Sequence, residues 1–501
     1  MFKNVLDCFE NTADKYAERP AVTDENTTIS YRELKNRAQK MGGALAGMIS
    51  QRQPVAVYGD KSISVLCAFL GIAYAGGCYT LLNPELPEDR LKTVCTLINS
   101  DFILTDDEHF KRASELFCDK KIILISSLLD MPAENSALLV ERRRRSIDTD
   151  PLYINFTSGS TGVPKGIVVS HRSVMDFISC FTELFDIGDT DVIGNQAPFD
   201  FDVSVKDIYS ALFTGARLVI IPRRLFSAPT ALIDYICENG VTTMIWAVSA
   251  LSLLKTFHAL EYKNPANVRK VLFSGEVMPN KVLNYLRRFL PNALLVNLYG
   301  PTEITCNCTY HILSPERDYA DGIPIGIPFP NEDVFLLDDE NREITEKDVS
   351  GEVCVRGTAL ALGYYRADDE NEKHFTPNPL NGCYPERIYR TGDLAKYDQN
   401  GELVFCGRKD FQIKYMGHRI ELEEIERRMA ETNGVEQCCC IFDDKKQRLK
   451  GYYIGSIDKA ELHSILKGSL PAFMVPGILH KLESFPLTKN GKTDRKKLAD
   501  L

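Results

Sequence analysis

The sequence predicts a multidomain α/β protein, and three observations point to this fold class. The chain has 501 residues, more than the roughly 100–200 residues of one domain. Hydrophobic residues make up 44% of it and charged residues 26%, which is typical of a globular protein with a sizeable core. Helical and strand patterns alternate over the first four-fifths of the chain, and such alternation favours layered α/β architecture.

The first elements follow from hydrophobic spacing. Residues 31–51 have helical spacing, 55–58 form a short apolar strand, and 62–75 are helical again. The stretch 67–81 is strongly apolar, but it is shorter than the ~20 residues that span a membrane and contains Gly76-Gly77. We therefore predict a buried helix that turns into a strand, and no membrane association.

The pattern of secondary structure changes in the later part of the chain. Residues 216–222 and 294–299 are typical of buried strands. From about residue 323, short strands and turns such as DVFLLDDENREI indicate an antiparallel β subdomain. A strand and a turn then precede a surface helix that we expect over 420–429. We divide the chain into two domains, 1–409 and 410–501.

Charge and cysteine usage exclude several classes of function. The net charge of −10 argues against a nucleic-acid binder, because non-specific affinity comes from accumulated Lys and Arg. The run Arg142–Arg145 is the exception, and we interpret it as a solvated linker rather than a phosphate or partner patch. The 15 cysteines are scattered over a long chain without a signal-peptide pattern, which favours reduced thiols and a cytoplasmic location. Cys306–Cys308 and Cys438–Cys440 have no partners at zinc-ligand spacing, so we expect buried thiols there.

The stretch NFTSGSTGVPKGIVVSH, residues 155–171, is rich in small polar residues. Such residues let backbone N–H groups and hydroxyls crowd around an anion, and Lys165 adds a positive charge. The spacing does not match a nucleotide P-loop, because Gly166 stands where Ser or Thr is required, and it does not match a Rossmann fingerprint either. From these residues alone, a phosphate cradle and a flexible surface loop both remain open.

Four further motifs follow in order along the chain: NLYGPTE at 297–303, YRTGDL at 389–394, GRKDFQIKYMGHRIELEEIE at 407–426 and PLTKNGKTDR at 486–495. With TSGSTGVPKG, the chain resembles the adenylate-forming superfamily over essentially its whole length. It is most similar to amino-acid adenylation domains of nonribosomal peptide synthetases and to stand-alone relatives such as D-alanine–carrier protein ligases. The resemblance implies a large N-terminal domain of layered α/β subdomains with a β-barrel-like subdomain, and a small mobile α+β C-terminal domain.

The resemblance also implies that ATP and Mg²⁺ activate a carboxylate as an acyl-adenylate, with release of pyrophosphate. Such transfer depends mostly on positioning and charge neutralisation. Glu303 matches the glutamate associated with magnesium, and Thr302 matches a residue that contacts the α-phosphate. The residues that would hold the departing phosphates are Thr157, Ser158, Gly159, Ser160, Thr161, Gly162 and Lys165. Those that would surround the adenine are Gly275, Glu276, Asn297, Leu298, Tyr299 and Gly300.

Five matched residues concern the ribose and the C-terminal domain. Asp393 matches a carboxylate that binds both ribose hydroxyls, and Arg408 is expected on the ribose or phosphate side. Lys492 matches a mobile lysine that bridges the substrate carboxylate and the α-phosphate, where its charge would stabilise the transition state. Asp410 matches the hinge. Gly417 falls on the loop that lines the pantetheine tunnel after the domain rotates.

The stretch FDVSVKD at 201–207 bears on the substrate. Asp202 matches the carboxylate that pairs with an α-ammonium group, which implies an α-amino acid. The matched pocket positions are Asp202, Val203, Lys206, Ser249, Leu272, Ser274, Leu298, Cys306 and Asn307. Several of them can donate hydrogen bonds, so an acidic side chain such as that of Glu or Asp is the sharper hypothesis. A small hydroxylated or other polar amino acid is the alternative. Against both hypotheses stands the interpretation that Lys206 snorkels out of the pocket and leaves Ser and Cys to define a small cavity.

No carrier-protein sequence follows the lysine motif, because the chain ends at KKLADL. We therefore expect a separate carrier protein with a phosphopantetheine thiol as acceptor, with coenzyme A left open. An acyl-coenzyme A synthetase of the same fold is one alternative, and Asp202 argues against it. A non-catalytic ATP-binding scaffold is another, and the retained Lys165, Glu303, Asp393 and Lys492 argue against that.

Overall fold

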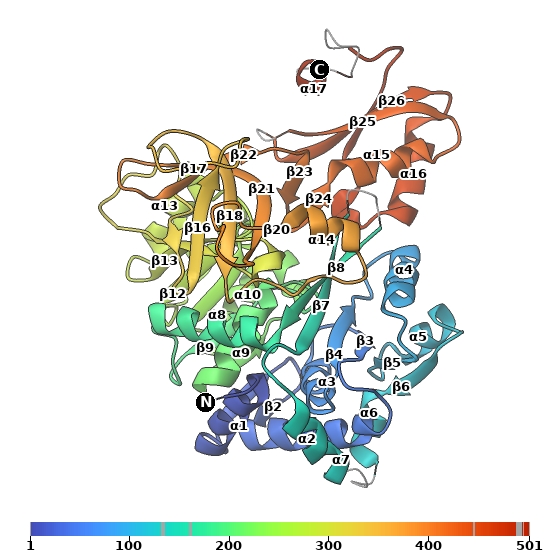
Figure 1. Ribbon diagram of the computed structural model, residues 1–501, viewed down its shortest axis with the longest axis vertical. Helices are drawn as coiled ribbons and strands as arrows, with labels where there is room; N and C mark the ends of the chain where they lie inside the picture. The colour runs from blue at the N-terminus through green and yellow to red at the C-terminus, as the bar shows by residue number, and fades with distance from the viewer. Residues whose placement is uncertain are drawn as a thin grey trace.

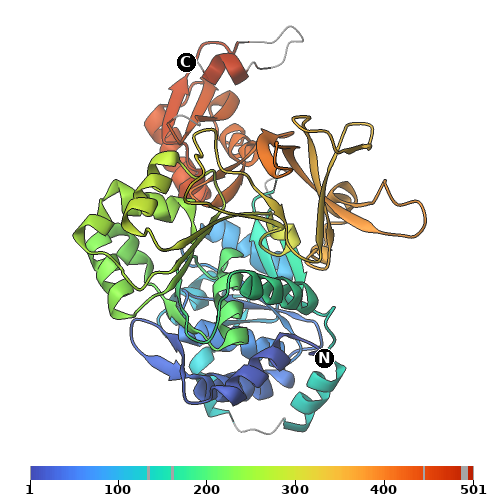
Figure 2. The same ribbon diagram turned by 90° about the vertical axis from the view of Figure 1, so that its left-hand side faces the viewer.

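The structure is a computed structural model that describes residues 2–131, 136–159, 163–443, 446–486, 493 and 495–499. A large body carries two sheets and a smaller antiparallel sheet, and the C-terminal unit, in orange and red, lies at one end of it (Figure 1, Figure 2). The N-terminal helices α1 (Val5–Lys15) and α2 (Tyr31–Ala46) lie toward the other end.

The first large sheet consists of β3 (Pro54–Tyr58), β4 (Cys78–Leu82), β5 (Phe102–Thr105), β6 (Lys121–Leu124), β7 (Pro151–Thr157), β8 (Lys165–Ser170) and β19 (Gly363–Tyr364). Their order is β19-β8-β7-β4-β3-β5-β6. The pairs from β7 to β6 are parallel, whereas β8 is antiparallel to both β7 and β19. Its helices are α3 (Ile63–Tyr74), α4 (Glu88–Ile98), α5 (Phe110–Leu116), α6 (Ile125–Asp130) and α7 (Ser136–Arg145).

The second large sheet consists of β1 (Pro20–Thr23), β2 (Thr28–Ser30), β9 (Val192–Asn195), β10 (Arg217–Ile220), β11 (Thr243–Ala247), β12 (Lys270–Ser274), β13 (Leu294–Tyr299), β14 (Thr309–Ile312) and β15 (Ile327–Pro328). Their order is β15-β14-β13-β12-β11-β9-β10-β1-β2, parallel from β13 to β1. Its helices and short 3-10 turns are α8 (His171–Leu184), α9 (Val203–Thr214), η1 (Arg223–Ser227), α10 (Pro229–Glu238), α11 (Val248–Thr256), α12 (Ala259–Tyr262), α13 (Asn280–Phe289) and η2 (Thr302–Ile304).

The antiparallel subdomain and the C-terminal unit complete the chain. The subdomain holds β16 (Glu332–Leu337), β17 (Glu343–Ile344), β18 (Gly351–Gly357), α14 (Asp368–His374), β20 (Phe375–Pro377), β21 (Arg387–Tyr397) and β22 (Leu403–Arg408). The C-terminal unit holds β23 (Gln412–Tyr415), β24 (His418–Glu421), α15 (Leu422–Ala430), β25 (Val435–Asp443), β26 (Arg448–Gly455), α16 (Lys459–Ser469), η3 (Ala472–Met474), β27 (Ile478–Lys481) and α17 (Arg495–Ala499). The unit packs around a buried core of its own, whereas one continuous core joins the two large sheets.

Local sequence explains how the helices that position the site begin. The hydroxyl of Ser62 caps α3 by accepting from the backbone N–H of Val65 at 3.2 Å. Every residue of α3 except the exposed Ser64 is buried, as its largely apolar sequence predicts. Ser170 caps α8 in the same way, through the N–H of Ser173 at 3.1 Å. The Ser170 cap marks the end of β8 and the start of α8.

Two predictions about local structure were wrong. The run Arg142–Arg145 is no linker: it ends helix α7, and Arg143 donates to Asp7 and Glu10 of α1 at 2.6 and 2.9 Å. The predicted helix at Ile420 begins two residues later, because Ile420 and Glu421 pair across the β23–β24 hairpin. No helix among the described residues is long and apolar enough to cross a membrane.

Candidate active site

The loop between β7 and β8 enters the site from the first large sheet. Within it, Ser158 is 4% exposed, and the Oγ1 atom of Thr157 is buried without a hydrogen-bond partner in the described structure. A Cβ atom on Gly159 would lie 2.1 Å from the carbonyl oxygen of Val163, so only glycine fits there. The predicted residues Ser160, Thr161 and Gly162 lie outside the described residues.

Lys165 follows the loop as the first residue of β8. Its side chain is 9% exposed, and its Nζ atom donates to Oε2 of Glu370 in α14 at 2.6 Å. The ring of Tyr364 lies 5.9 Å from the same ammonium group. Lys165 therefore has a resident counter-ion that the sequence analysis did not identify.

Glu303 in η2 is fully buried. Its Oε1 atom accepts hydrogen bonds from Tyr364 and from the guanidinium of Arg419, both at 2.7 Å. Burial raises the pKa of Glu303, but the Arg419 charge and the Tyr364 hydroxyl outweigh it, so the pKa lies at about 2. Its Oε2 atom is buried and has no hydrogen-bond partner in the described structure. An ionised carboxylate with a free oxygen fits a hard cation such as Mg²⁺.

The predicted ribose residues, Asp393 within β21 and Arg408 at the end of β22, lie together with the predicted adenine residue Tyr299 at the end of β13. The Tyr299 hydroxyl donates to Oδ2 of Asp393 at 2.5 Å, and Arg408 forms an ion pair with the other oxygen of Asp393. Arg408 also donates to both oxygens of Asp410, at 2.6 and 2.8 Å. This two-oxygen contact ties the predicted hinge residue to the nucleotide side of the site.

The residues predicted to surround the adenine lie at or just after the ends of β12 and β13. Asn297 donates to the carbonyl oxygen of Pro324 at 2.8 Å, and Leu298 on the next position is 2% exposed. Gly275 has a φ of 98°, and Glu276 accepts from the backbone N–H of Gly417 at 2.7 Å. Glu276 thus contacts the C-terminal unit.

Gly300 is required by a close approach of two chain segments. A Cβ atom there would lie 2.5 Å from Cα of Asn307, and backbone cannot move aside cheaply. Gly300→Ala should lower the free energy of unfolding by about 1–3 kcal/mol. Unfolding in urea followed by circular dichroism measures this. Gly188→Ala, where a Cβ would meet nothing within 4 Å, is the matched control, and equal destabilisation by the two variants would contradict the packing argument.

The predicted substrate pocket forms around the start of α9. Asp202 is 8% exposed and precedes α9, while Lys206 lies one helical turn later and is 1% exposed. Their spacing places both side chains on the same face of the helix. The other predicted positions are buried around this turn, apart from half-buried Ser249: Val203, Leu272, Ser274, Leu298, Cys306 and Asn307.

Lys206 does not reach solvent, so it does not snorkel out of the pocket. Its ammonium donates to Oδ1 of Asn307 at 2.7 Å and to Oγ of Ser274 at 3.3 Å. Burial lowers the pKa of Lys206 and raises the pKa of Asp202. Neither Asp202 nor Lys206 has an ion-pair partner within 4 Å among the residues that the structure describes. The pocket therefore holds two buried groups of opposite charge that act on each other only beyond ion-pair distance, and the buried Asp207 also acts on Lys206.

The β23–β24 hairpin of the C-terminal unit covers the site. A Cβ atom built on Gly417 at its tip would lie 3.4 Å from Ala247, 3.8 Å from Ser249 and 4.0 Å from Phe201. The carbonyl oxygen of Arg419 accepts from the Ser158 hydroxyl at 2.6 Å. Lys492 lies outside the described residues; α17 after it packs on β25, on the part of the unit turned away from β8 (Figure 1).

Comparison with known proteins supports this assembly of motifs. Residues 9–365 match the family described as AMP-binding enzyme. The chain belongs to the AMP-binding enzyme family. Bacitracin synthase 1 of Bacillus licheniformis is 33% identical over 508 aligned residues, which cover 99% of this chain and 9% of the synthase. This AMP-binding enzyme thus spans about a tenth of the length of that relative.

Solved structures agree with the fold. IdnL1 is 28% identical with a TM-score of 0.84, over 97% of this enzyme and 98% of that chain. Holo-PA1221, described as a nonribosomal peptide synthetase protein containing adenylation and PCP domains, is 25% identical with a TM-score of 0.85, over 99% of this enzyme and 84% of that chain. The AMP-binding enzyme is thus an AMP-forming ligase with the adenylate-forming fold, of the adenylation-domain type.

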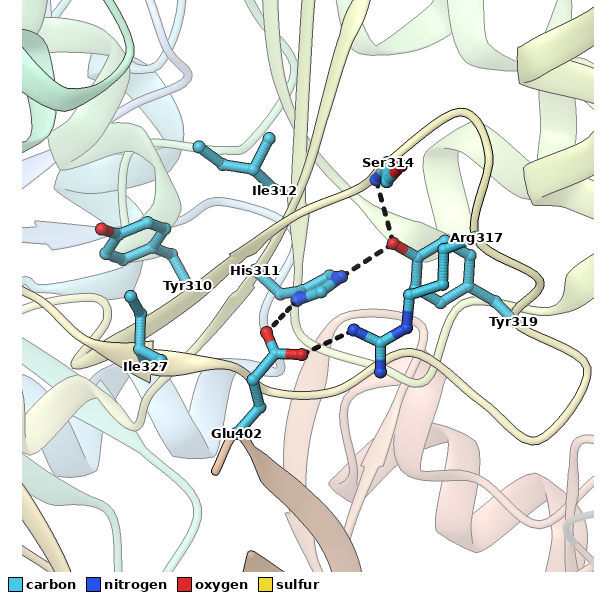
Figure 3. Close-up of a pocket in the computed structure, with 8 residues that line it drawn as sticks. All are labelled: Tyr310, His311, Ile312, Ser314, Arg317, Tyr319, Ile327 and Glu402. Atoms are coloured by element: carbon cyan, nitrogen blue, oxygen red, sulfur yellow. Dashed lines mark hydrogen bonds and ion pairs between the residues drawn. The ribbon is translucent and has the colours of Figure 1, made fainter. Parts of the chain in front are cut away.

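A cavity of about 360 Å³ lies away from these residues, beside β14 (Figure 3). His311 contacts Glu402 at 2.5 Å and Tyr319 at 2.9 Å, and Arg317 donates to Glu402 at 2.6 Å. These hydrogen bonds hold the segment after β14 against the turn before β22. The residues that line the cavity include none of the predicted site residues, and we place no substrate there.

The sequence analysis missed several residues that contact the predicted site, among them Tyr364, whose hydroxyl donates to Glu303. Arg419 and Lys414 were within the quoted motif at 407–426 but received no role; Lys414 lies 5.6 Å from the ring of Tyr299. Glu370 carried no signal at all, because DDENEK has the composition of an exposed helix. Its role is visible only once β19 and α14 are placed beside β8.

Proposed function

We propose that this AMP-binding enzyme activates an acidic α-amino acid, glutamate or aspartate, as its adenylate with ATP and Mg²⁺. Pyrophosphate leaves, and the aminoacyl group is then transferred to the phosphopantetheine thiol of a separate carrier protein. The proposal depends on one observation: Asp202 and Lys206 are buried on one helical face, with no direct counter-ion among the described residues. A cytoplasmic location remains a prediction from the cysteine usage.

An acidic amino acid supplies both missing charges. Its α-ammonium group would pair with Asp202, and its side-chain carboxylate would pair with Lys206 beside Asn307 and Ser274. Buried charges are costly unless they are paired and hydrogen-bonded, so the pocket favours a ligand with this charge pattern. A small or neutral amino acid would leave Lys206 unpaired.

The remaining residues fit the activation step. Asp393 and Arg408 would orient the ribose, and Lys165 would neutralise the departing phosphates. Glu303 would hold Mg²⁺ through its free Oε2 atom, and the bound ion would supply charge neutralisation at the phosphates. The C-terminal hairpin with Gly417 would then present the site to the thiol of the carrier. The relative PA1221, which contains adenylation and PCP domains, supports a carrier protein as the acceptor.

Lys206 variants test the substrate assignment. In amino-acid-dependent ATP–pyrophosphate exchange, Lys206→Met should lower kcat/KM for glutamate and aspartate by about 100-fold or more, because the substrate carboxylate loses its charged partner. Lys206→Glu should abolish the use of both. Lys206→Met removes the charge and keeps most of the side-chain length, and ATP affinity measured by calorimetry controls for folding. An unchanged preference in Lys206→Met would remove Lys206 from substrate recognition.

A further inference from the structure

Two buried ion pairs fill the region where the phosphates are proposed to bind. One joins Lys165 to Glu370 at 2.6 Å, with side chains 9% and 14% exposed. The other joins Arg419 to Glu303 at 2.7 Å, with side chains 14% and 0% exposed. Tyr364 links them, because its hydroxyl donates to Glu303 and its ring lies 5.9 Å from the Lys165 ammonium.

Glu370 is held firmly in its ionised form. Burial raises its pKa, but hydrogen bonds from Lys165 and Lys373 outweigh this, so the pKa of Glu370 lies at about 2. Lys373 donates to its other oxygen at 2.9 Å. A carboxylate oxygen thus occupies the position next to Lys165 where a phosphate oxygen would have to lie.

Arg419 presents the opposite charge to Glu303. Its guanidinium contacts the carboxylate that we propose as the magnesium residue, and its backbone carbonyl accepts from Ser158 of the phosphate loop. Arg419 belongs to the same hairpin as Gly417, whose N–H donates to Glu276 at 2.7 Å. The contacts of Arg419 and the docking of the hairpin over the substrate pocket therefore occur together.

We propose that Glu370 and Arg419 are built-in substitutes for pyrophosphate and for its metal ion, so that metal–pyrophosphate and the docked hairpin compete for one site. Lys165 would leave Glu370 for bound pyrophosphate, and a metal ion held by the free Oε2 atom of Glu303 would weaken the Arg419–Glu303 pair by neutralising the carboxylate. Once both leave, Lys165 pairs with Glu370 again, and the Arg419–Glu303 pair holds the hairpin in the docked position. The inference rests on the proposed function for the identity of the phosphate site, and it assigns a positioning role to both residues.

Calorimetric titration with pyrophosphate in excess MgCl₂ tests the role of Glu370. Glu370→Gln keeps the shape of the side chain but removes its charge, so it should bind pyrophosphate about tenfold more tightly than the unchanged protein. Glu372→Gln removes the same charge from an exposed position of α14 and should leave the affinity unchanged. Equal affinities in the two variants would overturn the role of Glu370.

Hydrogen exchange over residues 411–421 tests the competition itself. Saturating pyrophosphate with MgCl₂ should raise deuterium uptake in this segment, because the hairpin loses the contacts of Gly417 and Arg419. In Glu370→Gln the midpoint of this change should move to lower pyrophosphate concentration. Unchanged uptake in the saturated protein would overturn the competition. If the unchanged protein bound no pyrophosphate, the proposed function would fail, and the inference with it.

Discussion

Replacement of Lys492 with alanine should lower amino-acid-dependent ATP–pyrophosphate exchange by about 100-fold or more, because the developing charge loses a positioned cation. The same variant should still transfer the aminoacyl group from a supplied adenylate to a pantetheine thiol. The reason is that the structure places the hairpin of Gly417, and not the segment of α17, against the substrate pocket. The two half-reactions would therefore use different faces of the C-terminal unit.

The two half-reactions must be measured separately for this variant. Exchange reports adenylate formation, and mass spectrometry of a phosphopantetheine carrier reports transfer from the supplied adenylate. Lys489→Ala, three residues earlier in the same motif, is the matched control and should leave exchange unchanged. Equal loss of both half-reactions in Lys492→Ala would contradict the role assigned to Lys492.

Asp202→Asn should lower kcat/KM for the amino acid by about 100-fold or more, because removal of one partner of a buried charge pair costs roughly 3–5 kcal/mol. The affinity for ATP should stay within about twofold, since the contacts of Asp393 and Arg408 in the described structure do not involve Asp202. Initial rates of exchange against amino-acid concentration measure the first effect, and calorimetry with ATP measures the second.

Asp200→Asn is the control for Asp202. Asp200 is a half-buried carboxylate two residues earlier, and it accepts hydrogen bonds from Asn83 at 3.1 and 3.2 Å. Asp200→Asn should therefore lower kcat/KM for the amino acid far less than Asp202→Asn does. A loss of ATP affinity in Asp202→Asn as large as the loss in kcat/KM would show that the variant disturbs the whole site, and would contradict recognition of the α-ammonium group.

Local patterns predicted the fold well because each element carries its own periodicity. The apolar run 63–74 could only be a buried helix, and the strand at 294–299 is where the apolar stretch predicted it. Sequence patterns failed where contacts with another part of the chain determine the conformation. Ile420 has helical neighbours in sequence, but it pairs with Ile413 across a hairpin. From sequence, Arg143 is typical of a solvated surface residue. In the structure it donates hydrogen bonds to Asn4, Asp7 and Glu10.

The site shows the same division. The motifs located Glu303, Asp393 and Arg408, because each of these residues has the same neighbours in sequence as the matching residue of the family motif. The counter-ions could not be found in this way: Glu370 and Lys165 are 205 positions apart, and Arg419 and Glu303 are 116 apart. No spacing rule connects such residues. Only the pairing of β19 with β8 and the docking of the hairpin bring them together.

The most direct test of the substrate pocket is ATP–pyrophosphate exchange by the unchanged protein with four acids. Glutamate supplies both charges, glutarate lacks the α-ammonium group, and norvaline and glutamine lack the side-chain carboxylate. Aspartate and the D-isomers extend the series. Exchange with glutamate or aspartate at least about 100-fold above that with glutarate, norvaline and glutamine is the expected result. Exchange as strong with norvaline would remove the role of Lys206, and exchange as strong with glutarate would contradict amino-acid activation through Asp202.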